Sequence, residues 1–496
     1  MSVCCLAWWW HGWGVPPSPL GIPTRDELLD LARQQALLIA VQERQLEALG
    51  ARVLELEARL AGDSKNSSRP PSADGLGKPP TRSLRRKSGL GPGGQSGHRG
   101  STLMQVEKPD EVRTHRPGRC AGCGQKLDQQ AKVVSVQRRQ VFELPVVKAR
   151  VVEHRLVEIA CDCGHATLAP APAGVRAPVQ YGPRLRSAVL YLYQGQFLSK
   201  GRTAQAAAEL FGVPVSAGSV ANFQKMADRQ LDGFMEQVKA SACSAGVLGA
   251  DETGLRVAGR TGWLHVARDD KMTVMEVNPR RGATAMRQIG VLDKFKGILV
   301  RDALGSYDAV GERVADQLCG AHLARELMAV SEFLSAHPEY ARPCGWDWAE
   351  QAAKGLWGIK QGRDQAEDRV CPPDVFERGR HLMVSAGLIA AKGGCSPPGP
   401  LGDKHLALAR RIAARVDEYL LFAANPKVPF DNNGSERDLR MAKLRMKVSG
   451  GFRTMTGAQQ FARLRSYLST TAKNNVAGYD AMIRLFTGHP WLPATT

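Results

Sequence analysis

Residues 247–251 read Val247-Leu248-Gly249-Ala250-Asp251, a short apolar run that ends at an acid. An apolar run of this length is typical of a buried strand. Short apolar runs of the same kind occur at 262–267, 272–277 and 297–300. A short helix is predicted at 283–289, before the last of these runs. The order β-β-β-α-β therefore predicts an α/β core. It places one acid, Asp251, at the end of the first strand and another, Asp302, just after the fourth.

A second informative stretch runs from 431 to 447. The turn-forming cluster Asn-Asn-Gly-Ser leads there into a predicted helix that begins near Ser435. Side chains at i, i+4, i+7 and i+11 share one face of a helix, and here they are Glu436, Arg440, Lys443 and Lys447. A carboxylate beside a basic row suits a metal ligand next to a phosphate backbone. The alternative is a solvated, salt-bridged surface helix.

The composition indicates a partner and a compartment. The chain has 496 residues and a net charge of +19, which favours nucleic acid as the partner and an anionic membrane surface second. No apolar run reaches the roughly 18 residues of a membrane span. Eleven cysteines in so long a chain favour a reducing compartment, with some of them used for metal. We therefore expect a cytoplasmic, nucleoid-associated protein of several domains.

The N-terminal part divides into three segments. Residues 1–23 are predicted to be a disordered extension. Residues 24–62 repeat apolar side chains every seven positions, which predicts a coiled-coil helix and self-association; a single amphipathic helix packed on its own protein is the alternative. Residues 63–105 are rich in Gly, Pro, Ser and basic side chains, so we expect a disordered linker that either binds phosphates or only solubilises the chain.

Two cysteine pairs lie within 106–172. Cys120 and Cys123 are separated by two residues, whereas Cys161 and Cys163, after a stretch predicted to be rich in strands, are separated by one. Paired thiols on strands resemble a zinc ribbon, in which four thiolates bind tetrahedral Zn²⁺. The shorter second spacing leaves room for His165 or His154 to serve as a ligand. Unpaired structural cysteines are the alternative.

The rest of the chain is predicted to be largely helical. Within 176–240, two helices around the break at 212–214 are similar to a helix-turn-helix, although an ordinary helical hairpin fits equally well. Residues 321–427 are mostly helical, 428–480 contain the helix near Ser435 and a final helix, and 481–496 are expected to be a tail.

Three acids stand out once the elements are placed together: Asp251, Asp302 and Glu436. Oxygen ligands are those that hard divalent cations prefer. Phosphoryl transfer is well served by two ions about 3.5–4 Å apart, one at the attacking and one at the leaving oxygen. Each acid alone has a plainer interpretation, because an Asp at a strand end is usually a turn residue and an early helical Glu favours the helix dipole. Their joint placement favours a catalytic site.

At these residues the chain resembles the insertion-sequence-66-type DDE transposases, over roughly 25–480. The matching segments are Ala250-Asp251-Glu252-Thr253-Gly254, Trp263-Leu264-His265-Val266, Arg301-Asp302 with Tyr307, Cys319 through His322 to Leu327, and Asp431-Asn432-Asn433 through Glu436 to Phe452-Arg453. The resemblance implies a multidomain α/β protein. Its parts would be a leucine-zipper-like N-terminus, a zinc-binding module, a helical DNA-binding region at 176–240 and a ribonuclease-H-like mixed-sheet core. That core would comprise 246–320 and 428–480, with 321–427 as a helical insertion.

The resemblance also implies an activity and its residues. Asp251, Asp302 and Glu436 would be the catalytic triad that holds Mg²⁺ or Mn²⁺, cleaves transposon ends and joins them to target DNA. The cation row would contact DNA through Arg437, Arg440, Lys443, Lys447 and Arg453. A homo-oligomer, accessory proteins of the same mobile element and a structural Zn²⁺ are expected. His322 is best interpreted as a satisfied core histidine, and contact with the scissile phosphate and a metal site shared with Cys319 are the alternatives.

Two other classes of function remain open at this point. A catalytically inactive, zinc-containing DNA-binding or regulatory protein would explain the charge and the cysteines but not the three acids. Another ribonuclease-H-like endonuclease would explain the acids and would cleave DNA without joining it. The Cys-x-Cys spacing departs from the family's usual Cys-x-x-Cys, which bears on the geometry of the zinc module.

Overall fold

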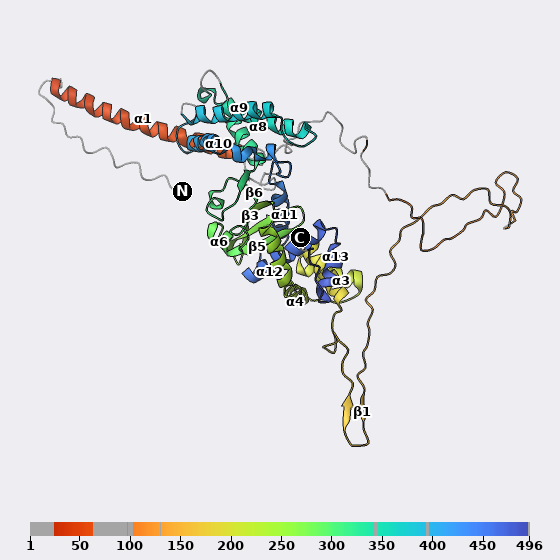
Figure 1. Ribbon diagram of the computed structural model, residues 1–496. Helices are drawn as coiled ribbons and strands as arrows, with labels where there is room; N and C mark the ends of the chain where they lie inside the picture. Colours follow the sequence, from red (N-terminus) through yellow and green to blue (C-terminus); the bar gives the residue numbers. More distant parts are fainter. Residues whose placement is uncertain are drawn as a thin grey trace, which may run out of the picture.

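The computed structural model describes residues 24–62, 97, 103–128, 130–341, 346–392 and 396–494. The predicted extension at 1–23 and nearly all of the predicted linker at 63–105 lie outside these residues. Over these residues the protein is mixed α/β, with one five-stranded sheet, one two-stranded sheet and many helices (Figure 1). Among the described helices, none is both long and apolar enough to cross a membrane.

The predicted order β-β-β-α-β is confirmed. The large sheet has the order β5-β4-β3-β6-β7. β3 pairs antiparallel with β4 and β4 with β5, whereas β6 runs parallel to β3 and β7 parallel to β6. The elements are β3 (Val247–Val257), β4 (Arg260–Arg268), β5 (Thr273–Asn278), α6 (Ala283–Ile289), β6 (Ile298–Arg301) and β7 (Ala315–Leu318).

The first strand is longer than predicted. β3 does not end at Asp251, because its antiparallel pairing with β4 continues to Val257↔Arg260. Ala258 and Gly259 close this hairpin, both with positive φ. Asp251 therefore lies inside a strand rather than in a turn. β7 was not predicted, since two of its four residues are polar.

The parallel pairing sets the positions of the two strand acids. β3 pairs with β6 from Val247↔Ile298 to Gly249↔Val300. Asp251 and Asp302 each lie two residues beyond that last pair. Because side chains alternate between the faces of a sheet, the same offset puts both acids on the same side of neighbouring strands.

Helices cover both faces of this sheet. α11 (Asn433–Ser449) packs on β3 and β4, and α12 (Met455–Lys473) packs on β5. Leu439 and Phe461 join Leu264 and Val277 in a buried cluster on one face. Leu248 and Leu299 belong to a second cluster, which contains side chains from α5 (Asp232–Cys243), α6 and the C-terminal part of α12.

The segment predicted to be helical before the sheet is helical. It contains α2 (Pro183–Leu190), a π-helical turn over Tyr191–Gly195, α3 (Lys200–Phe211), α4 (Ala217–Asp228) and α5. The last helix, α13 (Gly478–Phe486), packs on α2 and α4 and buries Met482 and Leu485. It continues past residue 480, where the tail was expected to begin.

A further group of helices packs beside β7, the edge strand next to β6. They are α7 (Gly320–Ala336), α8 (Trp348–Gln365), α9 (Pro373–Ala391) and α10 (Pro400–Ala424). Trp348 is fully buried among them, and Val300 and Leu318 join the same cluster from β6 and β7. The buried Gln317 of β7 donates to Tyr419 O (3.0 Å) and accepts from Phe422 N (2.7 Å) of α10. These bonds attach the helical segment to the sheet.

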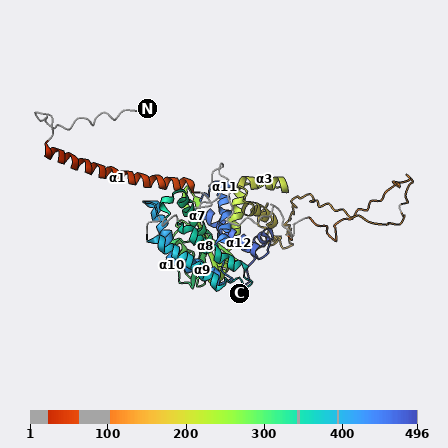
Figure 2. The same ribbon diagram turned by 90° about the horizontal axis from the view of Figure 1, so that it is seen from above.

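Two parts project from this body. α1 (Arg25–Ala61) begins at a capping box formed by Thr24 and Glu27, has no buried residue and contacts α10 near one end (Figure 2). Residues 103–170 run outward in long excursions, with the hairpin of β1 (Glu158–Ala160) and β2 (Ala166–Leu168) far from the body (Figure 1).

The segment between the cysteine pairs is poorer in strands than predicted. In its described residues, regular pairing is limited to the Arg119–Lys126 bridge and the three-residue β1. Val134, Val141 and Leu144 are exposed there, so these apolar side chains have no surface to pack on. An isolated hairpin without such a surface is marginal in water.

Asn432 joins α11 to the sheet. This buried side chain donates from Nδ2 to the carbonyl of Ala250 (2.7 Å) and accepts the hydroxyl of Ser435 (2.7 Å). Its backbone N–H donates to the Cys319 sulfur (3.2 Å). The approach is so close that a Cβ at Gly249 would lie 2.8 Å from Ser435 Oγ. The start of α11 is thereby held directly beside Asp251.

We expect Asn432→Ala to lower the melting temperature of the protein, because it leaves buried polar groups of Ala250 and Ser435 without their partner, at about 1–3 kcal/mol. Asn433→Ala, at the exposed neighbouring position, is the matched control and should change stability by no more than about 0.5 kcal/mol. Thermal unfolding of both variants measures the difference. Equal melting temperatures would show that the Asn432 bond does not hold α11.

Candidate active site

The three predicted acids come from three separate elements. Asp251 lies within β3 and accepts a hydrogen bond from the N–H of Glu252 (2.8 Å). Asp302 directly follows β6 and accepts from Leu304 N (3.0 Å), which turns the chain. Glu436 lies in the first turn of α11. The Asn432 bonds and the β3–β6 register bring these elements to one place.

The pKa of Asp251 depends on the charges of the other acids. Burial raises the pKa of Asp251 to about 8, with help from the negative charges of Glu252, Asp302 and Glu436. A like charge nearby disfavours the ionised form of a carboxyl group, and burial strengthens that effect. The charges of Asp302 and Glu436 thus both act on the carboxyl group of Asp251.

The donor set suits a hard divalent cation. Carboxylate oxygens are the ligands that Mg²⁺ and Mn²⁺ prefer, and a cation would relieve the repulsion that raises the pKa of Asp251. Across the described residues, no three His, Cys, Asp or Glu side chains converge closely enough to hold a metal ion between them. The three acids therefore suit a divalent cation in the type of their ligand atoms and in their charge.

A buried arginine fixes the backbone at Asp302. Arg301 is fully buried, and its guanidinium donates to the carbonyls of Asp302 (3.1 Å) and Leu304 (3.3 Å). The same group pairs with Asp316 of β7 (2.6 Å) and with Asp308. Because these bonds surround the turn, they hold Asp302 at the C-terminal end of β6.

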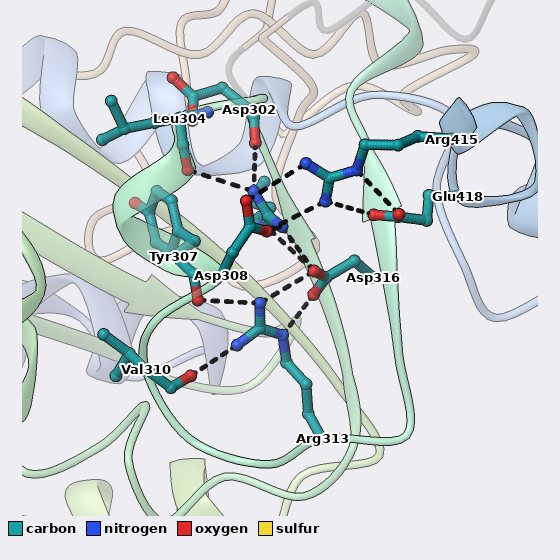
Figure 3. A network of polar contacts seen from close by, with 10 residues as sticks. Asp302, Leu304, Tyr307, Asp308, Val310, Arg313, Asp316, Arg415 and Glu418 are labelled. Carbon is teal, nitrogen blue, oxygen red and sulfur yellow. Dashed lines mark hydrogen bonds and ion pairs between the residues drawn. The ribbon is translucent and has the colours of Figure 1, made fainter. Parts of the chain in front are cut away.

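The helical segment also reaches this turn. Arg415 of α10 donates to Asp308 (3.0 Å) and to Glu418 (2.6 Å) (Figure 3). α10 is interrupted at Arg415, whose φ of −126° and ψ of 25° are not helical. The turn after Asp302 is therefore tied to a helix more than 100 positions later in the sequence.

Glu252 is a buried acid next to Asp251 that we did not single out from the sequence. Its side chain is fully buried, accepts from Tyr307 Oη (2.5 Å) and pairs with Arg281 (2.8 Å). Burial raises the pKa of Glu252, while the bonds from Tyr307 and Arg281 lower it. The sequence contains two consecutive acids, Asp251 and Glu252. Because side chains alternate along a strand, Glu252 points to the face opposite Asp251.

Glu436 has two basic neighbours from α7. Arg325 Nη2 lies 3.3 Å and His322 Nε2 3.6 Å from Glu436 Oε1. Burial lowers the pKa of His322, and Arg325 lowers it further. Nδ1 of His322 is buried without a hydrogen-bond partner. The prediction of a satisfied core histidine is therefore wrong, because His322 lies against the acid cluster.

The predicted cation row lies at the surface. Arg437, Arg440, Lys447 and Arg453 are exposed and Lys443 is half-buried. Within the part of the chain that the structure describes, these five side chains form no ion pair with a carboxylate. Glu436 pairs instead with Arg325 of α7. The row therefore presents uncompensated positive charge beside the acid cluster.

The two cysteine pairs are each formed as local turns. The pKa of Cys120 is lowered by hydrogen bonds from the backbone N–H groups of Cys123 and Gly122. A bond from the backbone N–H of Cys163 likewise lowers the pKa of Cys161. Both turns favour thiolates, the form that binds Zn²⁺. In the described chain the two pairs do not converge on one metal position.

Comparison with known proteins adds two matches. Residues 178–460 match the profile of the family described as Transposase IS66 family. This range contains the helices before the sheet, the whole five-stranded sheet, the helical segment and α11. Residues 21–104 match a family of unknown function, DUF6444. No curated protein matches the chain.

The raised pKa of Asp251 predicts how stability depends on pH in the absence of divalent cations. The unfolded carboxyl ionises at about pH 3.9 and the folded one at about pH 8, so its contribution to stability is present below about pH 4 and is lost progressively up to about pH 8. The side chain in Asp251→Asn does not ionise, so this variant does not lose stability in this way as the pH rises. In EDTA at pH 8 the variant should therefore melt above the wild type, and the two melting temperatures should approach each other toward pH 4.

Thermal unfolding from pH 4 to 9 measures this difference. Asp270→Asn, at a fully exposed hairpin position, is the control and should follow the wild type throughout. An Asp251→Asn protein that melts below the wild type at pH 8 would contradict the buried, repelled state of the carboxyl.

Proposed function

The chain belongs to the Transposase IS66 family, and we propose that it cleaves the ends of a transposon and joins them to target DNA. The observation that supports this proposal is that Asp302, just after β6, and Glu436 of α11 both raise the pKa of Asp251 in β3. Family membership supports the transposase role. The acid cluster supports metal-dependent phosphoryl transfer as its chemistry.

We propose that the sheet and its helices form a ribonuclease-H-like core. Three antiparallel strands, a helix and two parallel strands in the order β5-β4-β3-β6-β7 support this assignment. So does the position of the acids, one on the central strand and one just after its parallel neighbour. Residues 321–427 would then be an insertion between the second and third acids.

In this proposal Asp251, Asp302 and Glu436 would hold the catalytic Mg²⁺ or Mn²⁺. When bound, such a cation polarises a phosphoryl oxygen and compensates charge that develops in the transition state. Asp251 must release its proton to bind a cation, so its raised pKa makes binding tighter as the pH rises toward 8. The ion pair with Arg325 of α7 would fix the orientation of the Glu436 carboxylate.

The cation row gives the substrate its position. Side chains of Arg437, Arg440, Lys443, Lys447 and Arg453 would hold backbone phosphates, which fixes the register of the DNA without reading its sequence. In-line attack at a phosphorus needs the substrate held in this way next to the carboxylates. The same polyanion explains the net charge of +19 and would keep the protein with the bacterial nucleoid.

The proposal also includes an oligomer and a structural Zn²⁺. Paired transposon ends call for an oligomer, and α1 supports one because Leu46, Leu49 and Leu60 are exposed on it. Accessory proteins of the same element could join this assembly. A structural Zn²⁺ would be held by Cys120, Cys123, Cys161 and Cys163, if the two turns come together around it.

Zinc analysis of the purified protein tests that last assignment. We expect about one Zn²⁺ per chain in the wild type and its loss in Cys120→Ser, because a structural zinc site needs all four of its thiolate ligands. The control is Cys243→Ser, which changes a thiol of α5 that contacts backbone carbonyls. Zinc-free wild-type protein, or equal zinc in both variants, would contradict the site.

The activity is tested with duplex DNA that carries the inverted repeats flanking the gene. Asp251→Asn and Glu436→Gln should each lower Mg²⁺-dependent cleavage by roughly 100-fold or more, because a lost carboxylate weakens cation binding and transition-state stabilisation. Asp270→Asn should cleave as the wild type does, since its side chain is fully exposed. DNA binding in EDTA should survive in all three.

Strand-transfer products distinguish the proposed transposase from another ribonuclease-H-like endonuclease, which would yield cleaved ends alone. An inactive DNA-binding protein would yield neither. Cleavage by Asp251→Asn at the wild-type rate would contradict the catalytic assignment.

A further inference from the structure

The pairing of β3 with β6 ends before it reaches the acids. Its last pair is Gly249↔Val300, and Asp251 and Asp302 each lie two residues farther along the chain. Burial raises the pKa of Asp251, and the charges of Glu252 and Asp302 raise it further, so Asp251 and Asp302 repel each other. The strand pairing therefore leaves the distance between these two acids to other contacts, which must act against a repulsion that would widen it.

A side-chain contact joins the two segments beyond the last pair. Glu252 follows Asp251 on β3 and accepts a hydrogen bond from Tyr307 Oη (2.5 Å). Tyr307 ends a 3₁₀ turn five positions after Asp302. Because side chains alternate along a strand, this bond lies on the face opposite Asp251. It therefore ties β3 to the turn that follows Asp302 without occupying the face on which the acids lie.

Both partners of this bond are fixed by further contacts. Arg281 donates to Oε1 of Glu252 from Nε (2.9 Å) and Nη2 (2.8 Å), whereas Tyr307 donates to Oε2. The guanidinium of Arg301 lies 5.5 Å from the centre of the Tyr307 ring. Arg313 donates to the carbonyl of Tyr307 (3.0 Å) (Figure 3). Neither side chain can therefore turn away without breaking other contacts.

The same contacts exclude Glu252 as a ligand of a cation bound by Asp251. Its side chain is fully buried, both of its oxygens accept hydrogen bonds, and it points to the opposite face. A carboxylate buried next to another one is unfavourable, and such exceptions are expected mainly at functional sites. The role that remains for Glu252 at such a site is to hold Tyr307.

We propose that Glu252 and Tyr307 are positioning residues that hold Asp302 beside Asp251, at a separation from which both can bind one divalent cation. This inference rests on the proposed function and extends it to two side chains that do not themselves touch the cation. Their hydrogen bond keeps the acids from moving apart before a cation is bound. Side chains that orient metal ligands in this way typically contribute roughly 10- to 100-fold to metal affinity.

Tyr307→Phe tests the role of the bond, because it removes only the hydroxyl and keeps the buried ring. We expect it to weaken Mn²⁺ binding to the DNA-free protein by roughly 10-fold, since Asp302 is then free to move away from Asp251. Electron paramagnetic resonance of the unbound ion measures the affinity, and the binding that Asp251→Asn abolishes defines the site. In EDTA, the backbone amides of 303–308 should exchange hydrogen faster in Tyr307→Phe than in the wild type.

Tyr467→Phe is the matched control. The hydroxyl of Tyr467 is also buried, donates to Ala481 O (3.1 Å) and accepts from Trp491 N (2.9 Å). Both variants should lower the melting temperature, because each leaves a buried polar group without its partner. Only Tyr307→Phe should weaken Mn²⁺ binding. In a Glu252→Met background, where the acceptor is already missing, Tyr307→Phe should have no further effect on the Mn²⁺ affinity.

Equal Mn²⁺ affinities of Tyr307→Phe and the wild type would overturn the proposal. So would an equal loss in Tyr467→Phe, because the affinity would then follow stability alone, or unchanged hydrogen exchange at 303–308. Wild-type protein whose Mn²⁺ binding is insensitive to Asp251→Asn would contradict the cation site of the proposed function, and the positioning role with it. Failure of the pair alone is therefore distinguishable, since the wild type would still bind Mn²⁺ through Asp251.

Discussion

The hydrogen bond from Asn432 to the carbonyl of Ala250 is the contact on which the site depends. It connects two segments 182 positions apart, and it acts next to Asp251 on one side and four residues before Glu436 on the other. A helix that packed on the sheet through apolar side chains alone could slide or rotate, because such contacts are not directional. The buried amide removes that freedom. Gly249 completes the constraint by letting α11 approach the strand.

The rest of the site follows from placing acids where they repel one another. Burial and three neighbouring carboxylates raise the pKa of Asp251 to about 8, which is a local loss of stability. The surrounding structure offsets it with satisfied polar contacts, of which those of Arg301 are the most extensive. Charge of the opposite sign is concentrated on α11, the helix that carries Glu436. Separated acidic and basic regions of this kind suit a cation and a polyanion that bind side by side.

The sequence predicted what depends on periodicity and local chemistry. Short apolar runs marked β3 to β6, and the acids near their ends marked the candidate site. It could not show that β3 continues through Asp251, because that depends on pairing with β4, nor that Ala315-Asp316-Gln317-Leu318 is a strand. Arg301 and Glu252 were missed as site residues because their partners, Asp316 and Tyr307, are distant in the sequence. The apolar pattern between the cysteine pairs failed as a predictor, since no surface covers it.

The central claim is that Asp251, Asp302 and Glu436 form one cation site. Anomalous diffraction from crystals soaked in Mn²⁺ tests it most directly, because the signal locates the ion independently of activity. The account predicts anomalous density in contact with all three carboxylates, absent from crystals of Glu436→Gln or displaced from its side chain. Well-ordered crystals in which Mn²⁺ binds only elsewhere, or touches Asp251 and Asp302 while Glu436 remains paired with Arg325, would contradict it.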